Sequence, residues 1–225
     1  MEPPPLNDDL PNDSIEAGPQ PLNQRLGESV GHVGQEEMNK KFADRFFQDT
    51  SNIRNMATPA IHRSYKEFLA YFSCLQVLTE HNIIIGAYFT YGWMPTILDL
   101  RGDLDEIVTI ANSVKQSRMI TDEQLRKVAV AINGSVVGAS KLLHFICPTD
   151  HAIWDSRVYR YLHQEEPYTY RLEAPNEYWN YLTALERLAG DERFPAAKQE
   201  VEKVVGYSVT DKRAAELVMF FNGKK

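Results

Sequence analysis

The sequence has few cysteines and no long apolar run, and both absences narrow the class of protein. Only two of the 225 residues are cysteine, Cys74 and Cys147, and they form neither a CxxC pair nor a metal-ligand spacing with histidine. No apolar stretch approaches the roughly 20 residues that cross a bilayer. The first residues are acidic and proline-rich, unlike a secretory signal. We therefore expect a cytoplasmic protein with reduced thiols, and we expect neither a metal site nor a cofactor.

The alternation of apolar and polar residues that indicates strands is also missing. Apolar residues instead recur at helical spacing, as in the series Tyr65, Phe68, Leu69, Phe72, Leu75 and Leu78. Helix-capping signals occur at Thr58-Pro59, at Thr96, at Thr121 with Gln124, at Asp155 and at Thr210-Asp211. The sequence therefore predicts an all-α domain of eight to ten helices. One of these helices is expected from Thr96 to about Ala111, and another after Pro175.

Residues 1–37 differ in composition from the remainder of the chain. They hold six prolines, and their eight acidic residues against the single base Arg25 account for the whole formal net charge of −7. Such a composition predicts a disordered acidic tail, followed by a helical domain over residues 38–225. Because that domain is neutral, the charge excludes no partner, and a local basic face for nucleic acid stays compatible with the sequence.

The most informative segment runs from Ser135 to Leu162. A glycine turn opens a short apolar helix, a polar loop follows at residues 148–151, and Asp155 opens a second helix. The N–H groups and the dipole at a helix N-terminus favour a negative charge. A carboxylate fixed there, beside a loop-lined cleft, can stabilise a developing cation or orient a water molecule. As an ordinary N-cap, the same aspartate contributes about 1 kcal/mol of stability.

This segment resembles the helix-hairpin-helix family of DNA glycosylases. Residues 137–140, Val-Gly-Ala-Ser, resemble the second half of the hairpin, and residues 153–160 resemble the acid-bearing phrase that follows it. The chain is closest in character to phage-associated members, which excise glucosylated hydroxymethylcytosine or act on hypermodified thymine. It departs from the family pattern at Val136, where a glycine is usual, and in the short interval from Ser140 to Asp155.

The resemblance implies a helix-hairpin-helix DNA-glycosylase-like fold and a monofunctional N-glycosylase. Such an enzyme flips a modified base out of DNA and excises it, here in antiviral defence, with DNA as the partner. Asp155 takes the position of the catalytic aspartate, and Ser140 takes a position where monofunctional members have a small or polar residue. Lys141 becomes a Schiff-base candidate only if the alignment shifts by one residue. The DNA contacts are expected from Gly134, Gly138, Ser140, Arg157 and Arg160.

The pocket for the flipped base is expected from aromatic and polar side chains elsewhere, with the region from Tyr88 to Pro95 as the main candidate. The candidates are Tyr88, Tyr91, Trp93, Trp154, His144 and His151. Each also fits packing in the core. Two other functions stay open: a transferase that modifies hypermodified thymine in phage DNA, and a non-catalytic DNA-binding module on the same scaffold. Any of these proteins would associate with the nucleoid when bound to DNA.

Overall fold

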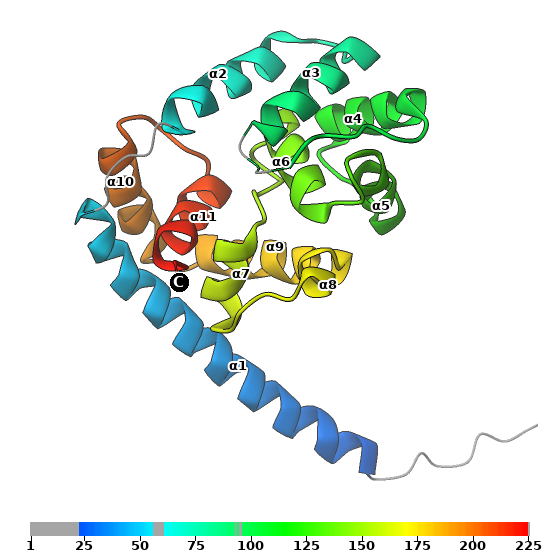
Figure 1. Ribbon diagram of the computed structural model, residues 1–225. Coiled ribbons are helices and arrows are strands. Elements are labelled where there is room, and N and C mark those ends of the chain that lie inside the picture. The colour runs from blue at the N-terminus through cyan, green and yellow to red at the C-terminus, as the bar shows by residue number, and fades with distance from the viewer. Residues whose placement is uncertain (1–22, 56–60, 93, 95, 225) are drawn as a thin grey trace, which may run out of the picture. The chain divides into compact units, whose positions relative to one another are not determined.

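The computed structural model describes residues 23–55, 61–92, 94 and 96–224 (Figure 1). Within these ranges the chain forms eleven α-helices and one 3-10 helix. The only β-type pairing in the described ranges is an isolated bridge between Leu100 and Ile132. The all-α class is therefore confirmed, with one α-helix more than the highest number expected. The helix-hairpin-helix glycosylase fold itself stays a prediction.

The chain divides into two compact units, residues 1–40 and residues 41–225. Residues 1–22 of the predicted tail lie outside the described residues. Residues 23–37, also predicted to be disordered, lie in the N-terminal part of a helix that begins at Asn23. The last proline of the tail is Pro21, and the residues after it include several good helix formers such as Gln24, Arg25 and Leu26. The fold described below is that of the second unit.

The helices are connected by loops of different lengths, the longest over residues 92–103. In chain order they are α1 (Asn23–Thr50), η1 (Ser51–Asn55), α2 (Ile61–Cys74), α3 (Glu80–Tyr91), α4 (Leu104–Ser117), α5 (Asp122–Ala131), α6 (Val136–Ile146), α7 (Ser156–His163), α8 (Thr169–Leu172), α9 (Pro175–Ala189), α10 (Phe194–Val205) and α11 (Asp211–Asn222).

Most of the predicted helix starts are confirmed. Thr121 forms a capping box with Gln124 at the start of α5, and Thr210 caps α11. The start predicted at Thr96 is wrong, because α4 is capped by Asp103, whose side chain accepts hydrogen bonds from two N–H groups of the first turn. Gly102, with a φ of +80°, breaks any helix that continues from Thr96. The predicted cap at Thr58-Pro59 lies outside the described residues.

The helices of the second unit form two groups (Figure 1). In the first group, α2, α3, α4 and α5 all pack against α6, and in the second, α7, α9 and α10 pack against α11. Every residue of α6 from Gly138 to Ile146 is buried, in keeping with a helix that is apolar on almost all sides. The two groups are joined by the connection from α6 to α7, which is the segment singled out in the sequence.

Candidate functional site

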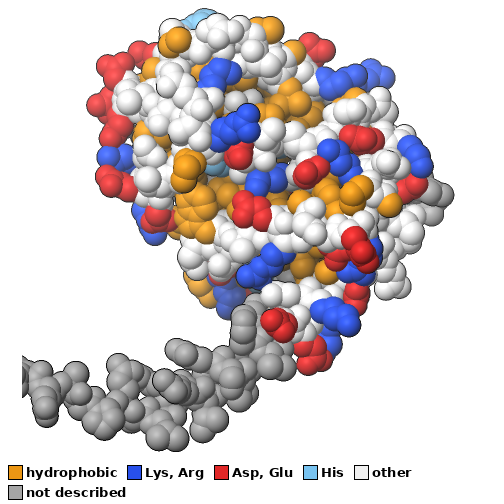
Figure 2. Space-filling model, turned by 180° about the vertical axis from the view of Figure 1, so that it is seen from behind, with side chains coloured by type: hydrophobic (Ala, Val, Ile, Leu, Met, Phe, Trp, Pro, Cys, Tyr) orange, Lys and Arg blue, Asp and Glu red, His pale blue; other side chains and the backbone are white. Residues whose placement is uncertain are grey.

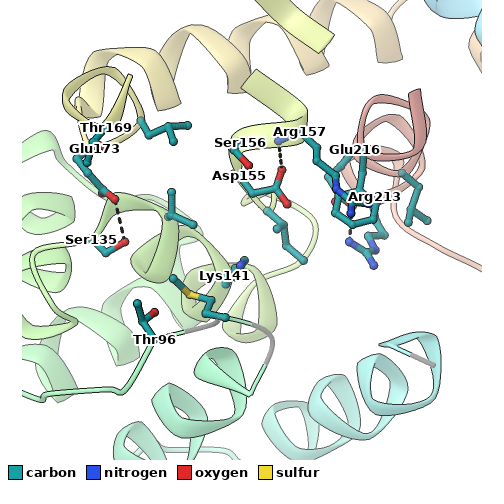
Figure 3. Close-up of a pocket in the computed structure, with 16 residues that line it drawn as sticks. Thr96, Ser135, Lys141, Asp155, Ser156, Arg157, Thr169, Glu173, Arg213 and Glu216 are labelled. Carbon is teal, nitrogen blue, oxygen red and sulfur yellow. Dashed lines mark hydrogen bonds and ion pairs between the residues drawn. The ribbon is translucent and has the colours of Figure 1, made fainter. Parts of the chain in front are cut away.

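A cleft of about 730 Å³ lies between the two groups of helices (Figure 3). Met94, Thr96 and the start of α6 line it from one group, and residues of α7, α8 and α11 line it from the other. Its volume falls in the range of pockets that enclose a small molecule. Six of the lining side chains are charged, three acidic and three basic: Asp155, Glu173, Glu216, Lys141, Arg157 and Arg213.

Asp155 is the N-cap of α7, as the sequence predicts, and it lines the cleft. Its Oδ1 accepts hydrogen bonds from the backbone N–H groups of Arg157, at 2.9 Å, and Val158, at 3.0 Å. These two donors hold the carboxylate in a fixed position at the first turn of α7. The geometry thus fixes a carboxylate at the cleft, while its catalytic role stays a prediction.

The backbone just before Asp155 is held by the buried hydroxyl of Ser140. This hydroxyl donates to the carbonyl of Val137 at 2.9 Å and accepts from the backbone N–H of Trp154 at 3.0 Å. Trp154 is also fully buried, and its indole N–H donates to the carbonyl of Leu172 at 3.0 Å. Both side chains therefore support the site from within the core, and neither is placed to touch DNA or a flipped base.

Lys141 follows Ser140 and lines the cleft, although only 6% of it is exposed. In Figure 3 it lies below Asp155, and Glu173 lies across the cleft. Burial lowers the pKa of its ammonium, while the nearby Asp155 and Glu216 act in the opposite direction. An amine whose pKa is lowered by burial is a better nucleophile near neutral pH.

Two charged residues of α11, Arg213 and Glu216, complete the side of the cleft near Asp155 (Figure 3). They form an ion pair in which Arg213 is 4% and Glu216 is 2% exposed. Burial raises the pKa of Glu216 to about 7, and the charge of Asp155 adds to this, whereas Arg213 and Lys141 oppose it. Our sequence reasoning missed both residues; the signal was an acid and a base three residues apart in an apolar helix.

The opposite side of the cleft is formed around Glu173, another residue that the sequence did not single out. Its carboxylate accepts a hydrogen bond from the backbone N–H of Val136 at 2.5 Å and one from the hydroxyl of Ser135 at 3.2 Å. Burial raises the pKa of Glu173, and the hydrogen bonds from α6 lower it. An internal carboxylate therefore occupies the N-terminus of α6, in the hairpin region where the resemblance predicts contacts with DNA.

The two glycines of the predicted hairpin serve the backbone turn before α6 and the packing of α6. Gly134 adopts a φ of +67°, in the region that favours glycine, and forms the turn before α6. A Cβ added at Gly138 would lie 2.9 Å from Cγ2 of Ile132 and 3.2 Å from the hydroxyl of Tyr91. Gly138 therefore allows close packing of α6. Neither glycine lines the cleft, so their DNA contacts stay predictions.

Of the predicted base-pocket aromatics near α3, Tyr88 and Tyr91 do not line the cleft. Tyr91 is buried, and its hydroxyl donates to the carbonyl of Ile132 at 3.3 Å, while Tyr88 is 56% exposed on α3. Trp93 lies outside the described residues. Its neighbour Met94 does line the cleft, so the region chosen for the pocket contributes through a different residue.

The two histidines are also part of the core. His144 is fully buried between the hydroxyl of Tyr65, at 2.8 Å, and the carbonyl of His151, at 2.7 Å, and burial lowers its pKa to about 3. Burial lowers the pKa of His151 to about 4. His151 lines a separate cavity of about 330 Å³ with Trp179 and Glu186. The structure does not bring either histidine to the cleft around Asp155.

The two arginines that were predicted to contact DNA lie in different hollows of the structure. Arg157 lines the cleft and lies over the ring of Phe220, 4.5 Å from its centroid. Arg160 lies in a different hollow, where it pairs with Glu166 at 3.0 Å. Over the face shown in Figure 2, basic and acidic side chains are interspersed, with apolar side chains between them. Such a mixed surface lacks the basic stripe that many nucleic-acid-binding proteins present.

Comparisons of the chain with protein-family models, with curated proteins and with solved structures found no match. In the part of the chain that the structure describes, no helix combines the length and the apolar character needed to cross a membrane. Within the same residues, no three His, Cys, Asp or Glu side chains are grouped so as to hold a metal ion.

Proposed function

We propose that this protein is a DNA N-glycosylase that hydrolyses the bond between a modified base and its deoxyribose. One observation carries the proposal: a carboxylate, that of Asp155, is fixed by two backbone N–H groups beside a cleft of about 730 Å³. Cleavage of the glycosidic bond develops positive charge on the sugar. A preorganised carboxylate next to C1′ stabilises that charge.

The lining of the cleft favours a large polar base as the substrate. Besides its six charged side chains, it presents the hydroxyls of Thr96, Ser135, Ser156 and Thr169. A base that carries a sugar, such as glucosylated hydroxymethylcytosine of phage DNA, offers hydroxyl groups to such a lining. The target atoms are inaccessible in a stacked duplex, so the nucleotide is flipped into the cleft. The setting is antiviral defence in the cytoplasm, on DNA.

In the proposed reaction the bond from C1′ to the base nitrogen breaks, and its electron pair leaves with the base. Asp155 stabilises the cationic sugar and accepts a proton from the water that attacks C1′. The products are the free base and an abasic site. Ser140 and Trp154 serve as positioning residues, because they hold the backbone that ends in Asp155.

The test is to incubate the full chain with hypermodified phage DNA and to measure free base by mass spectrometry together with abasic sites. We expect Asp155→Asn to reduce base release by about two to four orders of magnitude. Asp103→Asn is the matched control, because Asp103 caps α4 through the same two-donor geometry but is exposed and lies outside the cleft. Each substitution removes a negative charge but keeps a side-chain oxygen that can cap the helix, so equal activities in the two variants would contradict the proposal.

The position of Lys141 favours a second candidate function, an additional lyase step. After the base has left, its amine can condense with the C1′ aldehyde of the abasic sugar, releasing water and forming a Schiff base. Reduction with borohydride traps such an adduct, and Lys141→Met removes it. The monofunctional enzyme gives no adduct. A transferase requires an amine co-substrate and leaves no abasic site, and a binding module gives salt-sensitive binding without product.

A further inference from the structure

The cleft contains a second carboxylate near Asp155, and it differs from Asp155 in its surroundings. Asp155 lies at the N-terminus of α7, where two backbone N–H groups donate to it. Glu216 lies in the middle of α11, at a position that is 2% exposed, and its Oε2 accepts a hydrogen bond from the Arg213 side chain. In Figure 3 the two residues project from different helices at the same side of the cleft.

We infer that Glu216 is the general acid of the reaction and protonates the base as it departs, while Asp155 stabilises the sugar. This inference rests on the proposed glycosylase function. It assigns separate partners to the two carboxylates: the leaving group for Glu216 and C1′ for Asp155. Pairs of acids with different surroundings divide the roles of proton donor and charged stabiliser in this way.

The proton balance of the step is simple. As the bond from C1′ to the base nitrogen breaks, the electron pair passes to the base, and the Glu216 carboxyl gives its proton to that base. The attacking water gives a proton to Asp155, and exchange with solvent restores both groups. The Glu216 Oε2 accepts a hydrogen bond from Arg213, so Oε1 is the oxygen that can carry the proton.

The groups around Glu216 explain why it can hold a proton near neutral pH. Burial and the charge of Asp155 disfavour its ionised form, and together they outweigh the opposing charges of Arg213 and Lys141. Its neighbours also include the buried hydroxyls of Tyr65 and Tyr181 and the half-buried hydroxyl of Tyr207, and burial raises the pKa of each of these phenols. The phenols therefore stay neutral. The charges that act on the pKa of Glu216 are those of one carboxylate, Asp155, and of two cations, Arg213 and Lys141.

Glu173 does not fit the same role. Each of its two carboxylate oxygens already accepts a hydrogen bond, from Ser135 and from Val136, and these donors hold it at the start of α6. A general acid needs an oxygen that can release its proton toward the substrate. Among the three carboxylates of the cleft, Glu216 is the one whose surroundings suit proton donation.

The test is the pH profile of single-turnover base release from hypermodified phage DNA between about pH 5 and pH 9. The wild type should lose rate above about pH 7, where Glu216 ionises. Glu216→Gln should lower the rate below pH 7 by about two orders of magnitude or more and remove this alkaline decline. Asp155→Asn should keep the decline at a lower rate and move it to lower pH, because the charge of Asp155 helps to raise the pKa of Glu216. Glu106→Gln, an exposed acid of α4 paired with Lys127, is the control and should match the wild type.

A purely structural role for Glu216 makes a different prediction, namely an equal loss of rate at every pH. That result, or a Glu216→Gln profile with the alkaline decline of the wild type, would overturn this inference and leave the proposed function standing. The absence of base release by the wild type at any pH would overturn both. Because Glu216→Gln leaves Arg213 buried without its charged partner, the double variant with Arg213→Met provides the same readout where the single variant does not fold.

Discussion

The hydroxyl of Ser140 accepts a hydrogen bond of 3.0 Å from the backbone N–H of Trp154, and this bond connects α6 to the residue that precedes Asp155. The hydroxyl also donates to the carbonyl of Val137 in its own helix, so both of these hydrogen bonds are made inside the protein. The position of the proposed catalytic carboxylate therefore depends on a side chain that substrate does not touch.

We predict that Ser140→Ala lowers the free energy of unfolding by about 1–3 kcal/mol, because it leaves the buried N–H of Trp154 without a partner. Urea denaturation followed by circular dichroism measures this change. Ser73→Ala is the control: its hydroxyl also donates to a helical carbonyl but lies at an exposed site, so the change should stay within about 0.5 kcal/mol. Weaker DNA binding without lower stability in Ser140→Ala would support the DNA contact predicted from the sequence instead.

Gly138→Ala should also destabilise the fold, by about 1–3 kcal/mol, because the new methyl group meets Ile132 and Tyr91 in a packed core. Gly190→Ala is a suitable comparison, since it adds a methyl group whose nearest neighbouring atom is 3.6 Å away, at the end of α9. Thermal denaturation of both variants checks the prediction. Equal midpoints would show that the space around Gly138 adapts without cost.

Glu173→Gln should strengthen binding to duplex DNA. The substitution removes the negative charge that occupies the N-terminus of α6, so a phosphate competes more easily for the N–H of Val136. We expect a gain of about fivefold, which corresponds to roughly 1 kcal/mol, in fluorescence anisotropy titrations at fixed salt.

The control for this prediction is Glu165→Gln, which removes the same charge from an exposed site paired with Arg171. An equal gain in both variants would mean that overall charge alone decides the affinity. A gain confined to Glu173→Gln would place the phosphate at the hairpin.

The pH dependence of stability should report the burial of His144. Its pKa in the folded state is about 3, below the usual value of 6.5, so the unfolded chain binds the proton first as the pH falls. The stability contributed by the neutral histidine is therefore complete above about pH 6.5 and is lost at about 1.4 kcal/mol per pH unit below it. Glu216 has the opposite sign, because its raised pKa gives stability at low pH that is lost as the pH rises through 7.

Comparison of variants separates the two effects. The difference in unfolding free energy between the wild type and His144→Asn should shrink between pH 7.5 and pH 5, because the asparagine has no proton to gain. His81→Asn, at an exposed position of α3, should differ from the wild type by the same amount at both pH values. A constant difference for His144→Asn would show that this histidine is not held neutral by the fold.

The local signals in the sequence predicted the starts of several helices correctly, although the end expected at about Ala111 lies at Ser117. Thr121, Asp155 and Thr210 cap their helices where expected, because a cap depends on contacts within one turn. The exception at Thr96 has a local cause as well, the left-handed conformation of Gly102. The sequence did not reveal how α6 would be surrounded. Helices pack on it from several sides, so Ser140 and His144 are directed to partners in the core.

The sequence by itself thus determined the all-α class and the placement of Asp155 at the N-terminus of a helix, since both follow from spacing and from capping within a few residues. Only the tertiary structure decided which charged residues line the same cleft as Asp155. Lys141 comes from α6, Glu173 follows α8, and Arg213 and Glu216 come from α11. The physical reason is that side chains distant in sequence are brought together by helix packing, which removes them from water and so changes their charge and chemistry.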